Sequence, residues 1–483
     1  MQASTWSEGR GAGHESERER CGLYEFRADG RASTRRLAAI VRDGDELDLD
    51  TLSALLLIRA PARRGATPFR AITATRSEPV ERRDSIEPPR APRSEAEAAA
   101  ALLDVLRDAV DRALEGTTRA AVLVGGGLDS SGLLALAVEW AKRDSRRSVV
   151  ALAMDYEAPG DDRPYMRALE QHLGCEVVRI APEDASARMQ YLREGVDAAP
   201  LAWPTAPFEI EALARARREG AQRCLSGVAG DGLFDGAPNA LSALARRGDV
   251  IAAMRAARQL EGFDSPRSRV VSWIARPLLA RAEPNIVRRR RLRRLLTEPT
   301  WAGPTLRRLI ERQRDVFVAH AMMPRTGGAE RVAAAEAAPD LPYVDWLRHQ
   351  EEVASELPRR DPYLDPAVRR FVLSLPPEWL LAGSKRRGLY REAIRGLVPE
   401  MIYARMSKAD TEPGIVRIVD SAGGVGALAD LSRVRRLADL GLVEPRMFAK
   451  TFAALAADPV RSWDWATVWA VLAVEAFVAR HAR

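Results

Sequence analysis

The sequence has few of the residues from which metal clusters and disulfide frameworks are built. Three cysteines, Cys21, Cys175 and Cys224, and five histidines are spread over 483 residues. The cysteines lie far apart and form no CxxC pair. This pattern indicates neither a zinc site nor a disulfide framework.

Long apolar runs are also missing. The most apolar run, residues 465–474, is followed by Glu475 and is too short to span a bilayer. The N-terminus is polar and lacks the apolar segment of a secretory signal. We therefore expect a cytoplasmic protein with no membrane partner.

Basic residues are in excess, with 74 Lys and Arg against 67 Asp and Glu, which gives a net charge of +7. This balance suits a polyanionic ligand such as ATP and is also compatible with nucleic acid. Six arginines lie between residues 288 and 294, around Leu292. We interpret them as a solvated helix face, with a docking surface for an acidic partner or RNA as the second interpretation.

The most informative stretch is AAVLVGGGLDSSGLLALA, residues 120–137. An apolar run suits a buried parallel strand, and the later leucines recur at helical spacing, with Ser130 or Ser131 as the N-cap. A strand, a glycine turn and a helix start direct backbone N–H groups and the positive end of the helix dipole at one spot, which makes an anion site. The candidate residues for the phosphates of a nucleotide are Gly125, Gly126, Gly127, Leu128, Asp129, Ser130 and Ser131.

Two carboxylates in separate turns predict a magnesium ion. Asp129 would repel a phosphate unless a cation lay between them, so it indicates Mg²⁺. A second small-residue turn, at 226–231, ends in Asp231, and hard oxygen ligands from two turns suit octahedral Mg²⁺ together with ATP oxygens. The other interpretation of Asp231 is a simple turn aspartate. The candidate nucleotide contacts of this turn are Ser226, Gly227 and Gly230.

Apolar strands and amphipathic helices alternate from about residue 94. The expected elements are helices at 96–114, 164–173 and 208–219, and strands at 148–154 and 175–180. This order predicts an α/β fold with a doubly wound parallel sheet and a ligand at the carboxyl ends of its strands. Helical patterns dominate after residue 240 and predict an α-rich C-terminal lobe.

Three shorter segments precede this domain, which spans 94–483. Residues 1–20 are polar and are expected to form a disordered tail. Residues 21–76 contain short strand and helix fragments. Residues 77–93 are rich in Pro, Arg and Glu and are expected to be a linker.

Four motifs resemble those of the asparagine synthetase family. GGGLDSS resembles its SGGxDSS pyrophosphatase loop and is distinct from the Walker loop, GxxxxGK[ST]. RCLSGVAGDGLFDG, at 223–236, resembles SGxGGDELFGG, and residues 360–383 resemble hPFLDxxLVEFxxxLPxxxxxxG. KRRGLYREA, at 385–393, resembles KxxLRxA. The resemblance runs from about residue 94 to the C-terminus, and the pattern is most similar to the lasso-peptide cyclases.

The resemblance implies a PP-loop (adenine-nucleotide α-hydrolase) fold and several residue roles. The family's lysine in KxxLRxA neutralises charge on the ATP phosphates; counting back from Arg391 places Arg387 there, with Lys385 as the alternative. Met154 lies where the family holds adenine, and Asp365 is expected to cap a helix. The sequence also departs from the family, because Gly125, Val228 and Gly232 replace a serine and two glutamates.

AMP-forming amide synthesis is the implied activity, with ATP and Mg²⁺ as cofactors. A carboxylate is adenylated and an amine then attacks it. The first interpretation is a lasso-peptide-type macrolactam cyclase acting on a peptide or amino-acid carboxylate and an amine acceptor. A precursor peptide and a leader-processing protease are its candidate partners. The alternatives are an ammonia-dependent asparagine synthetase, a tRNA-modifying PP-loop enzyme and a non-catalytic ATP-binding protein. Nucleic acid is not expected to be a partner.

The resemblance also bears on the N-terminal segment. Asparagine synthetases begin with a glutaminase domain whose nucleophile is an N-terminal cysteine, whereas Gln2 occupies that position here. Cys21 would need processing to expose its amine, and residues 21–76 are fewer than a glutaminase domain needs. We expect a truncated glutaminase-like remnant, ending near Thr67–Arg70, without glutaminase activity.

Overall fold

The computed structural model describes residues 24–58, 63, 65–76, 92–157, 161–235, 237–260, 265–275, 278–279, 284–295, 297–322, 342–406, 410–460 and 464–481. The expected tail at 1–20, Cys21 and all but two residues of the expected linker at 77–93 lie outside the described residues.

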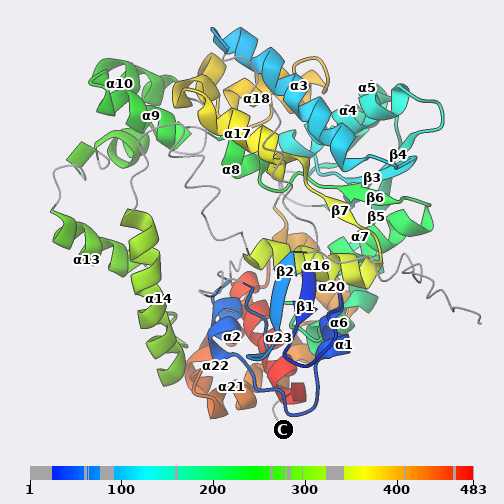
Figure 1. The fold of residues 1–483 in the computed structure, drawn as a ribbon, viewed down its shortest axis with the longest axis vertical. Coiled ribbons are helices and arrows are strands. Elements are labelled where there is room, and N and C mark those ends of the chain that lie inside the picture. The colour runs from blue at the N-terminus through cyan, green and yellow to red at the C-terminus, as the bar shows by residue number, and fades with distance from the viewer. Residues whose placement is uncertain are drawn as a thin grey trace, which may run out of the picture.

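A parallel five-stranded sheet crosses the upper half of the molecule in Figure 1. Its strands, in the order β5-β4-β3-β6-β7, are β5 (Val177–Ile180), β4 (Ser148–Met154), β3 (Arg119–Leu123), β6 (Arg223–Leu225) and β7 (Arg359–Arg360). Every pairing is parallel; in register, Val122 of β3 lies opposite Ala151 of β4 and Leu225 of β6. The predicted doubly wound parallel sheet is confirmed, although β5 begins two residues later than expected.

Both faces of the sheet are buried, because successive side chains of a strand point to opposite sides. Ala120 and Val122 belong to one apolar core, whereas Ala121 and Cys224 belong to another. Helices that supply the first core are α3 (Glu95–Ala113), α4 (Leu128–Lys142), α5 (Arg163–Leu173), α17 (Pro366–Ser374) and α18 (Gly388–Ala393). We call these helices and the sheet the upper lobe. Asp365 caps α17 as expected, since its side chain accepts a hydrogen bond from the Ala367 N–H at 2.8 Å.

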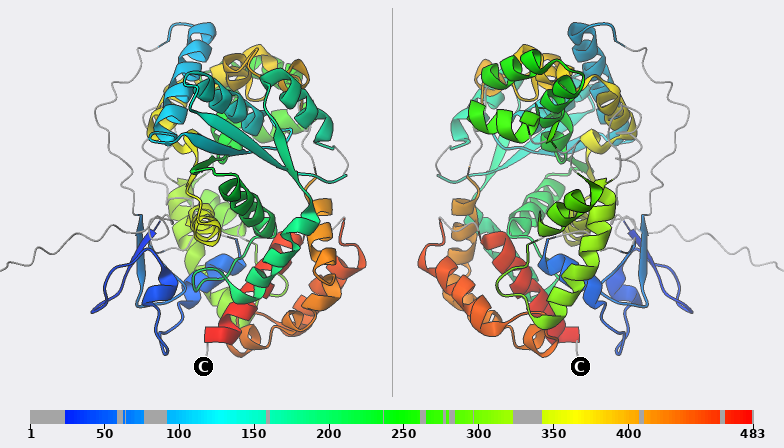
Figure 2. Two further views of the ribbon diagram at one scale, coloured as in Figure 1. Left: turned by 90° about the vertical axis from the view of Figure 1, so that its right-hand side faces the viewer. Right: turned by 90° about the vertical axis from the view of Figure 1, so that its left-hand side faces the viewer.

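The second core joins the sheet to a lower lobe. Its elements are β1 (Tyr24–Arg27), α1 (Leu37–Ile40), α2 (Leu49–Leu56), β2 (Thr73–Arg76), α20 (Glu412–Ser421), α21 (Arg435–Asp439), α22 (Pro445–Ala457) and α23 (Trp465–His481). Helices α7 (Ala206–Arg218) and α16 (Pro342–Ser355) lie between the two lobes (Figures 1 and 2).

The N-terminal segment shares its core with helices from the far end of the chain. Strands β1 and β2 form an antiparallel pair. The Phe26 ring meets the Trp346 ring at 5.9 Å between centroids, and Phe69 meets Phe477 at 5.8 Å. In both views of Figure 2 the blue N-terminal segment lies beside the red C-terminal helix. This segment is therefore part of the lower lobe and has no separate core.

A group of helices extends to the left in Figure 1. Among them are α9 (Ala237–Arg246), α10 (Val250–Gln259), α13 (Asn285–Leu295) and α14 (Pro304–Met322). Helix α13 carries the arginine cluster: Leu292 is buried, most of the arginines are exposed, and Arg293 pairs with Asp315 of α14 at 3.1 Å. None of the described helices combines the length and the apolar character that crossing a bilayer requires.

Candidate active site

The glycine turn after β3 leads directly into α4. The helix begins at Leu128 with Gly127 as its N-cap, so the prediction of Ser130 or Ser131 as the cap is wrong. The Ser130 hydroxyl instead closes the turn, donating to the Gly125 carbonyl at 3.0 Å and accepting from the Gly125 N–H at 3.2 Å. Because no side chain caps the helix, its first N–H groups are left for an anion.

Two of the predicted glycines serve neighbouring side chains. A Cβ on Gly126 would lie 2.4 Å from Nη1 of Arg405, and one on Gly230 would lie 2.9 Å from Cγ of Asp129. Gly126 therefore admits Arg405, and Gly230 admits Asp129. Ser131 is fully buried inside α4.

A cavity of about 790 Å³ opens at the carboxyl ends of the strands, within the size range of small-molecule sites. The predicted residues that line it are Gly125, Gly127, Leu128, Asp129, Ser130, Met154, Ser226, Gly227, Asp231 and Arg387. The predicted residues Gly126, Ser131, Gly230 and Lys385 are not part of its lining. The structure thus brings both predicted turns, Met154 and one of the two candidate cations to one cavity.

Asp129 and Asp231 meet on the guanidinium of Arg387. Nη1 of Arg387 lies 2.9 Å from Oδ2 of Asp129, and its Nη2 donates to Oδ1 of Asp231. The Asp129 side chain is mostly buried, whereas that of Asp231 is half exposed. Since both carboxylates converge on one cation, they fit the pair of ligands that a magnesium ion bound with ATP requires. Within the described ranges, no cluster of three or more His, Cys, Asp or Glu side chains offers a further metal site.

The backbone of Asp129 is held by two buried tyrosines. Tyr363 donates to the Asp129 carbonyl at 2.7 Å, and the hydroxyls of Tyr363 and Tyr390 lie 2.5 Å apart. The Phe234 ring stacks on Tyr390 at 4.3 Å between centroids. Burial raises the pKa of both tyrosines, so their hydroxyls stay protonated and remain donors. The motifs at 360–383 and 385–393 therefore hold the GGGLDSS turn in place through these tyrosines.

The two candidate cations lie in different surroundings. Arg387 is the N-cap of α18 and has a left-handed backbone, with φ of 57°. Such a conformation is uncommon for a non-glycine residue and is typical of functional sites. The Nζ of Lys385 lies over the ring of Tyr403, 5.3 Å from its centroid.

Arg405, to which the sequence assigned no site role, lines the same cavity. Its side chain is only 2% exposed, pairs with Asp162 at 2.6 Å and lies over the ring of Tyr165 at 3.8 Å. Arg386, also in the lining, pairs with Asp235. Arg405 follows KRRGLYREA and Leu397-Val398-Pro399 in the part of the sequence that resembles the family, and this place is the signal that could have identified it.

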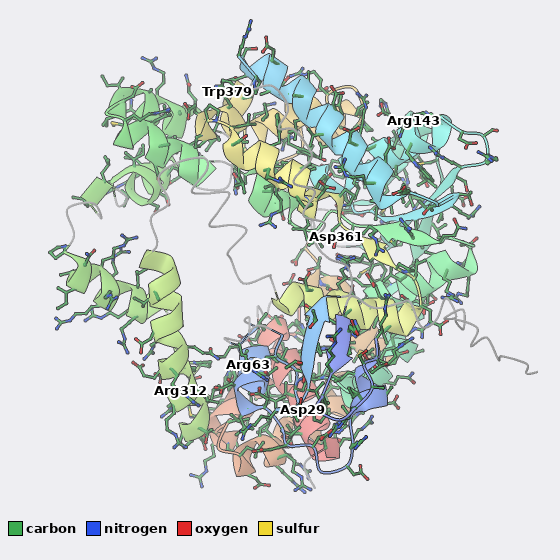
Figure 3. All side chains as sticks on the ribbon, in the orientation of Figure 1. Asp29, Arg63, Arg143, Arg312, Asp361 and Trp379 are labelled. Carbon is green, nitrogen blue, oxygen red and sulfur yellow. The ribbon has the colours of Figure 1, made fainter. Side chains whose placement is uncertain are left out.

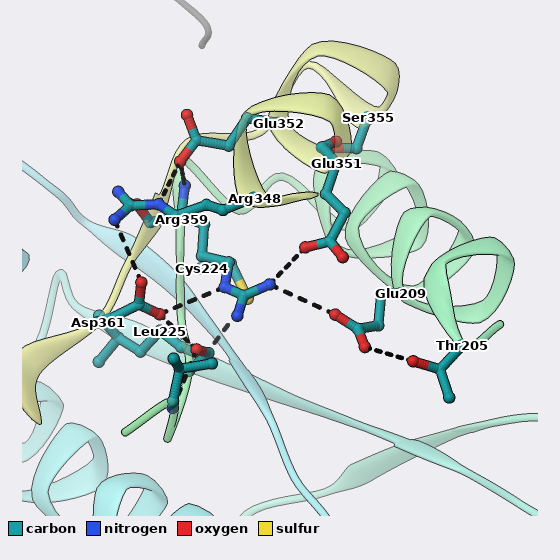
Figure 4. A network of polar contacts seen from close by, with 12 residues as sticks. Thr205, Glu209, Cys224, Leu225, Arg348, Glu351, Glu352, Ser355, Arg359 and Asp361 are labelled. Carbon is teal, nitrogen blue, oxygen red and sulfur yellow. Dashed lines mark hydrogen bonds and ion pairs between the residues drawn. The ribbon is translucent and has the colours of Figure 1, made fainter. Parts of the chain in front are cut away.

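A buried network of charges adjoins the cavity, and sequence reasoning missed it as well. Figure 4 shows Arg348 and Arg359 among four carboxylates, Glu209, Glu351, Glu352 and Asp361. Figure 3 places Asp361 near the middle of the molecule, between the two lobes. Ser226 of the second turn donates to Asp361, so the network reaches the predicted nucleotide site directly.

The pKa values of Asp361 and Glu351 in this network are shifted in opposite directions. Burial opposes the ionisation of Asp361, but Arg359 and Arg348 outweigh it and hold the pKa of Asp361 below its ordinary value. Burial, with the neighbouring charge of Glu209, raises the pKa of Glu351 well above its ordinary value. Glu351 therefore keeps its proton to a higher pH in the folded protein than in the unfolded chain.

Glu351→Gln is expected to stabilise the protein at high pH. The unfolded chain releases the Glu351 proton above a pH near 4.5, while the folded protein keeps it, so the free energy of unfolding falls as the pH rises. Glutamine imitates the protonated side chain and removes this loss. Thermal unfolding should show a higher Tm than wild type at pH 8 and a smaller difference near pH 5. An equal difference at both pH values would contradict the assignment.

Parallel strands with two small-residue turns and a nucleotide-sized cavity at their carboxyl ends define an α/β ATP-binding domain of the PP-loop type. The sequence matches the family described as asparagine synthase over residues 101–479, and the chain belongs to that family. Its members are ligases that form carbon–nitrogen bonds and convert ATP to AMP and pyrophosphate.

No curated protein matches the sequence. Among solved structures, the chain is similar to the U34-tRNA thiolase NcsA from Methanococcus maripaludis, with 14% identity over 52% of this chain and 80% of that one. The TM-score of 0.24 is too low to carry an argument about function.

Proposed function

We propose that the chain is an AMP-forming amide synthetase that closes a macrolactam ring in a peptide, as lasso-peptide cyclases do. The convergence of Asp129, Asp231 and Arg387 at the ends of two turns in one cavity carries this proposal. Such a grouping of opposite charges suits a triphosphate with its metal ion. A simple nucleotide-storage site would not need a cation aimed at two metal-ligating carboxylates.

The first step is adenylation of the carboxylate. A substrate carboxylate oxygen attacks the α-phosphorus of ATP, and the bond from that phosphorus to the bridging oxygen of pyrophosphate breaks. The N–H groups at the start of α4 and the Gly125–Ser130 turn bind the departing pyrophosphate. Asp129 and Asp231 would hold Mg²⁺, which when bound neutralises phosphate charge.

In the second step an amine nitrogen attacks the acyl carbon, the carbon–oxygen bond to AMP breaks, and the nitrogen loses its protons. Val228 lines the cavity beside Gly227. Val228 stands where asparagine synthetases carry a glutamate, and this departure from the ammonia-using enzymes supports a peptide α-amine as the acceptor.

The direct test uses the full chain, Mg-ATP and the short peptides encoded beside its gene. We expect a peptide product lighter by one water, with one AMP and one pyrophosphate formed for each ring. The same peptide with an acetylated α-amine is the control and should give no ring. Asparagine formed from aspartate and ammonia would establish the asparagine synthetase alternative. A thiolated or otherwise modified tRNA would establish the tRNA-modifying alternative.

Glutamine is expected not to serve as the nitrogen source. The described part of residues 24–76 forms one antiparallel strand pair within the lower lobe and contains no cysteine, so it offers no nucleophile for glutamine. Incubation of the full chain with glutamine, followed by a glutamate assay, should show no release above a boiled control. Steady release of glutamate would contradict this expectation.

A further inference from the structure

The network beside the cavity holds four carboxylates and two guanidiniums. Arg359 pairs with Glu209 at 3.4 Å and Asp361 at 3.3 Å, and also with Glu351. Arg348 pairs with Glu352 at 2.9 Å and Asp361 at 3.2 Å. Because four carboxylates face two guanidiniums, negative charge is in excess even when one carboxylate is protonated. A buried site with an uncompensated negative charge favours a cationic ligand.

Glu209 is the carboxylate of this network that reaches the cavity. Its side chain is 24% exposed, whereas those of Glu351, Glu352 and Asp361 are at most 3% exposed. Glu209 lines the cavity that also contains the Gly125–Ser130 turn. A cation that pairs with Glu209 would therefore share a cavity with the phosphates of ATP.

The carboxylate of Glu209 is fixed in position from two sides. The Thr205 hydroxyl donates to its Oε1 at 2.9 Å, and Nη1 of Arg359 lies 3.4 Å from its Oε2 (Figure 4). These contacts leave lone pairs on both oxygens for a further donor. An ammonium group has three donors and matches this requirement.

Glu351 supports Glu209 from the protein side. Its side chain is fully buried, and its Oε2 accepts a hydrogen bond from Arg359. Figure 4 shows Glu351 and Glu209 approaching the Arg359 guanidinium next to each other. Because Glu351 keeps its proton to a higher pH than an ordinary glutamic acid, it can donate to Glu209 and leaves the Glu209 carboxylate as the charged acceptor that lines the cavity.

We infer that Glu209 binds the acceptor amine as its ammonium form and accepts a proton from it. This inference rests on the proposed function. One N–H proton moves to the Glu209 carboxylate, and the neutral amine then forms the C–N bond as the bond to AMP breaks. The nitrogen's remaining excess proton leaves with the solvent. Thr205 and Arg359 act as positioning residues, since they orient Glu209.

Glu209→Gln separates the two steps of the reaction. ATP–pyrophosphate exchange, which reports adenylation, should change less than about twofold, while ring formation falls by about 10²–10⁴. Hydroxylamine is largely neutral at neutral pH and traps acyl-adenylates without a base. Its hydroxamate should therefore form at the wild-type rate in Glu209→Gln.

Glu211→Gln is the matched control. Glu211 lies on the same helix, pairs with Arg188 and Arg218, and does not line the cavity. All three readouts should stay at wild-type values in this variant. Unchanged ring formation in Glu209→Gln, or loss of exchange and hydroxamate together with the ring, would overturn the amine site. Absence of exchange in the wild type with every peptide tested would overturn the proposed function instead.

A measurement on the wild type keeps the inference testable if Glu209→Gln does not fold. A water-soluble carbodiimide with n-butylamine as the probe couples amines to carboxylates, and peptide mapping locates the amides. We expect Glu209 to be labelled at a level that saturates with butylamine, because the ammonium binds before it couples, while Glu211 stays unlabelled. Labelling of exposed Glu183 without any labelling of Glu209 would overturn the inference.

Discussion

Asp129→Asn and Asp231→Asn are each expected to abolish ATP–pyrophosphate exchange. Asparagine keeps the shape of the side chain and removes the charge. A carboxylate is the ligand that Mg²⁺ prefers, and loss of a partner that only supports a metal ligand already costs about 10–100-fold in affinity. Loss of a direct ligand should exceed that range. Both variants should also fail to bind Mn²⁺ in the presence of ATP, as measured by electron paramagnetic resonance.

Asp365→Asn provides the control for both variants. Asp365 caps α17 and pairs with Arg112 at 3.0 Å, away from the cavity. Asparagine is as good an N-cap as aspartate, so exchange and Mn²⁺ binding should be kept. Normal exchange and normal Mn²⁺ binding in both Asp129→Asn and Asp231→Asn would show that these carboxylates hold no metal.

The nucleotide turns were predictable because their signals are local. The strand, the glycine turn and the helix of residues 120–137 follow one another directly in the sequence, and each has its own pattern. The same is true of the turn at 226–231. Alternation of strands and helices then placed both turns at one edge of a parallel sheet. The error over the N-cap has the same local origin, since a serine after a glycine turn usually caps a helix, but here Ser130 closes the turn.

The charge network was beyond prediction from one sequence. Glu209 and Arg359 are 150 positions apart and meet only because α7 packs on α16 beneath the sheet. Nothing in their own neighbourhoods separates them from the other charged residues of an arginine-rich chain. The two-residue strand β7 is too short to show a period. Its position, and with it that of Arg359, depends on pairing with β6.

Arg387→Ala is expected to lower kcat by about 10²–10³ with little change in the KM for ATP. The α-phosphorus gains negative charge in the transition state that is missing from the ground state, so a fixed cation beside it lowers the barrier selectively. Steady-state kinetics of AMP formation measure both parameters. Lys385→Ala is the matched control: its ammonium lies over the Tyr403 ring outside the cavity lining, and its loss should cost less.

A second readout follows from the contacts of Arg387 with both carboxylates. Its guanidinium lies between Asp129 and Asp231, where a metal ion would compete with it for the same oxygens. Arg387→Ala should therefore bind Mn²⁺ more tightly than wild type in the absence of ATP, although its turnover is lower. A residue that only stabilised the fold would weaken metal binding and turnover together. Full activity of Arg387→Ala alongside an inactive Lys385→Ala would reverse the two roles, and full activity of both single variants and of the double variant would remove this segment from catalysis.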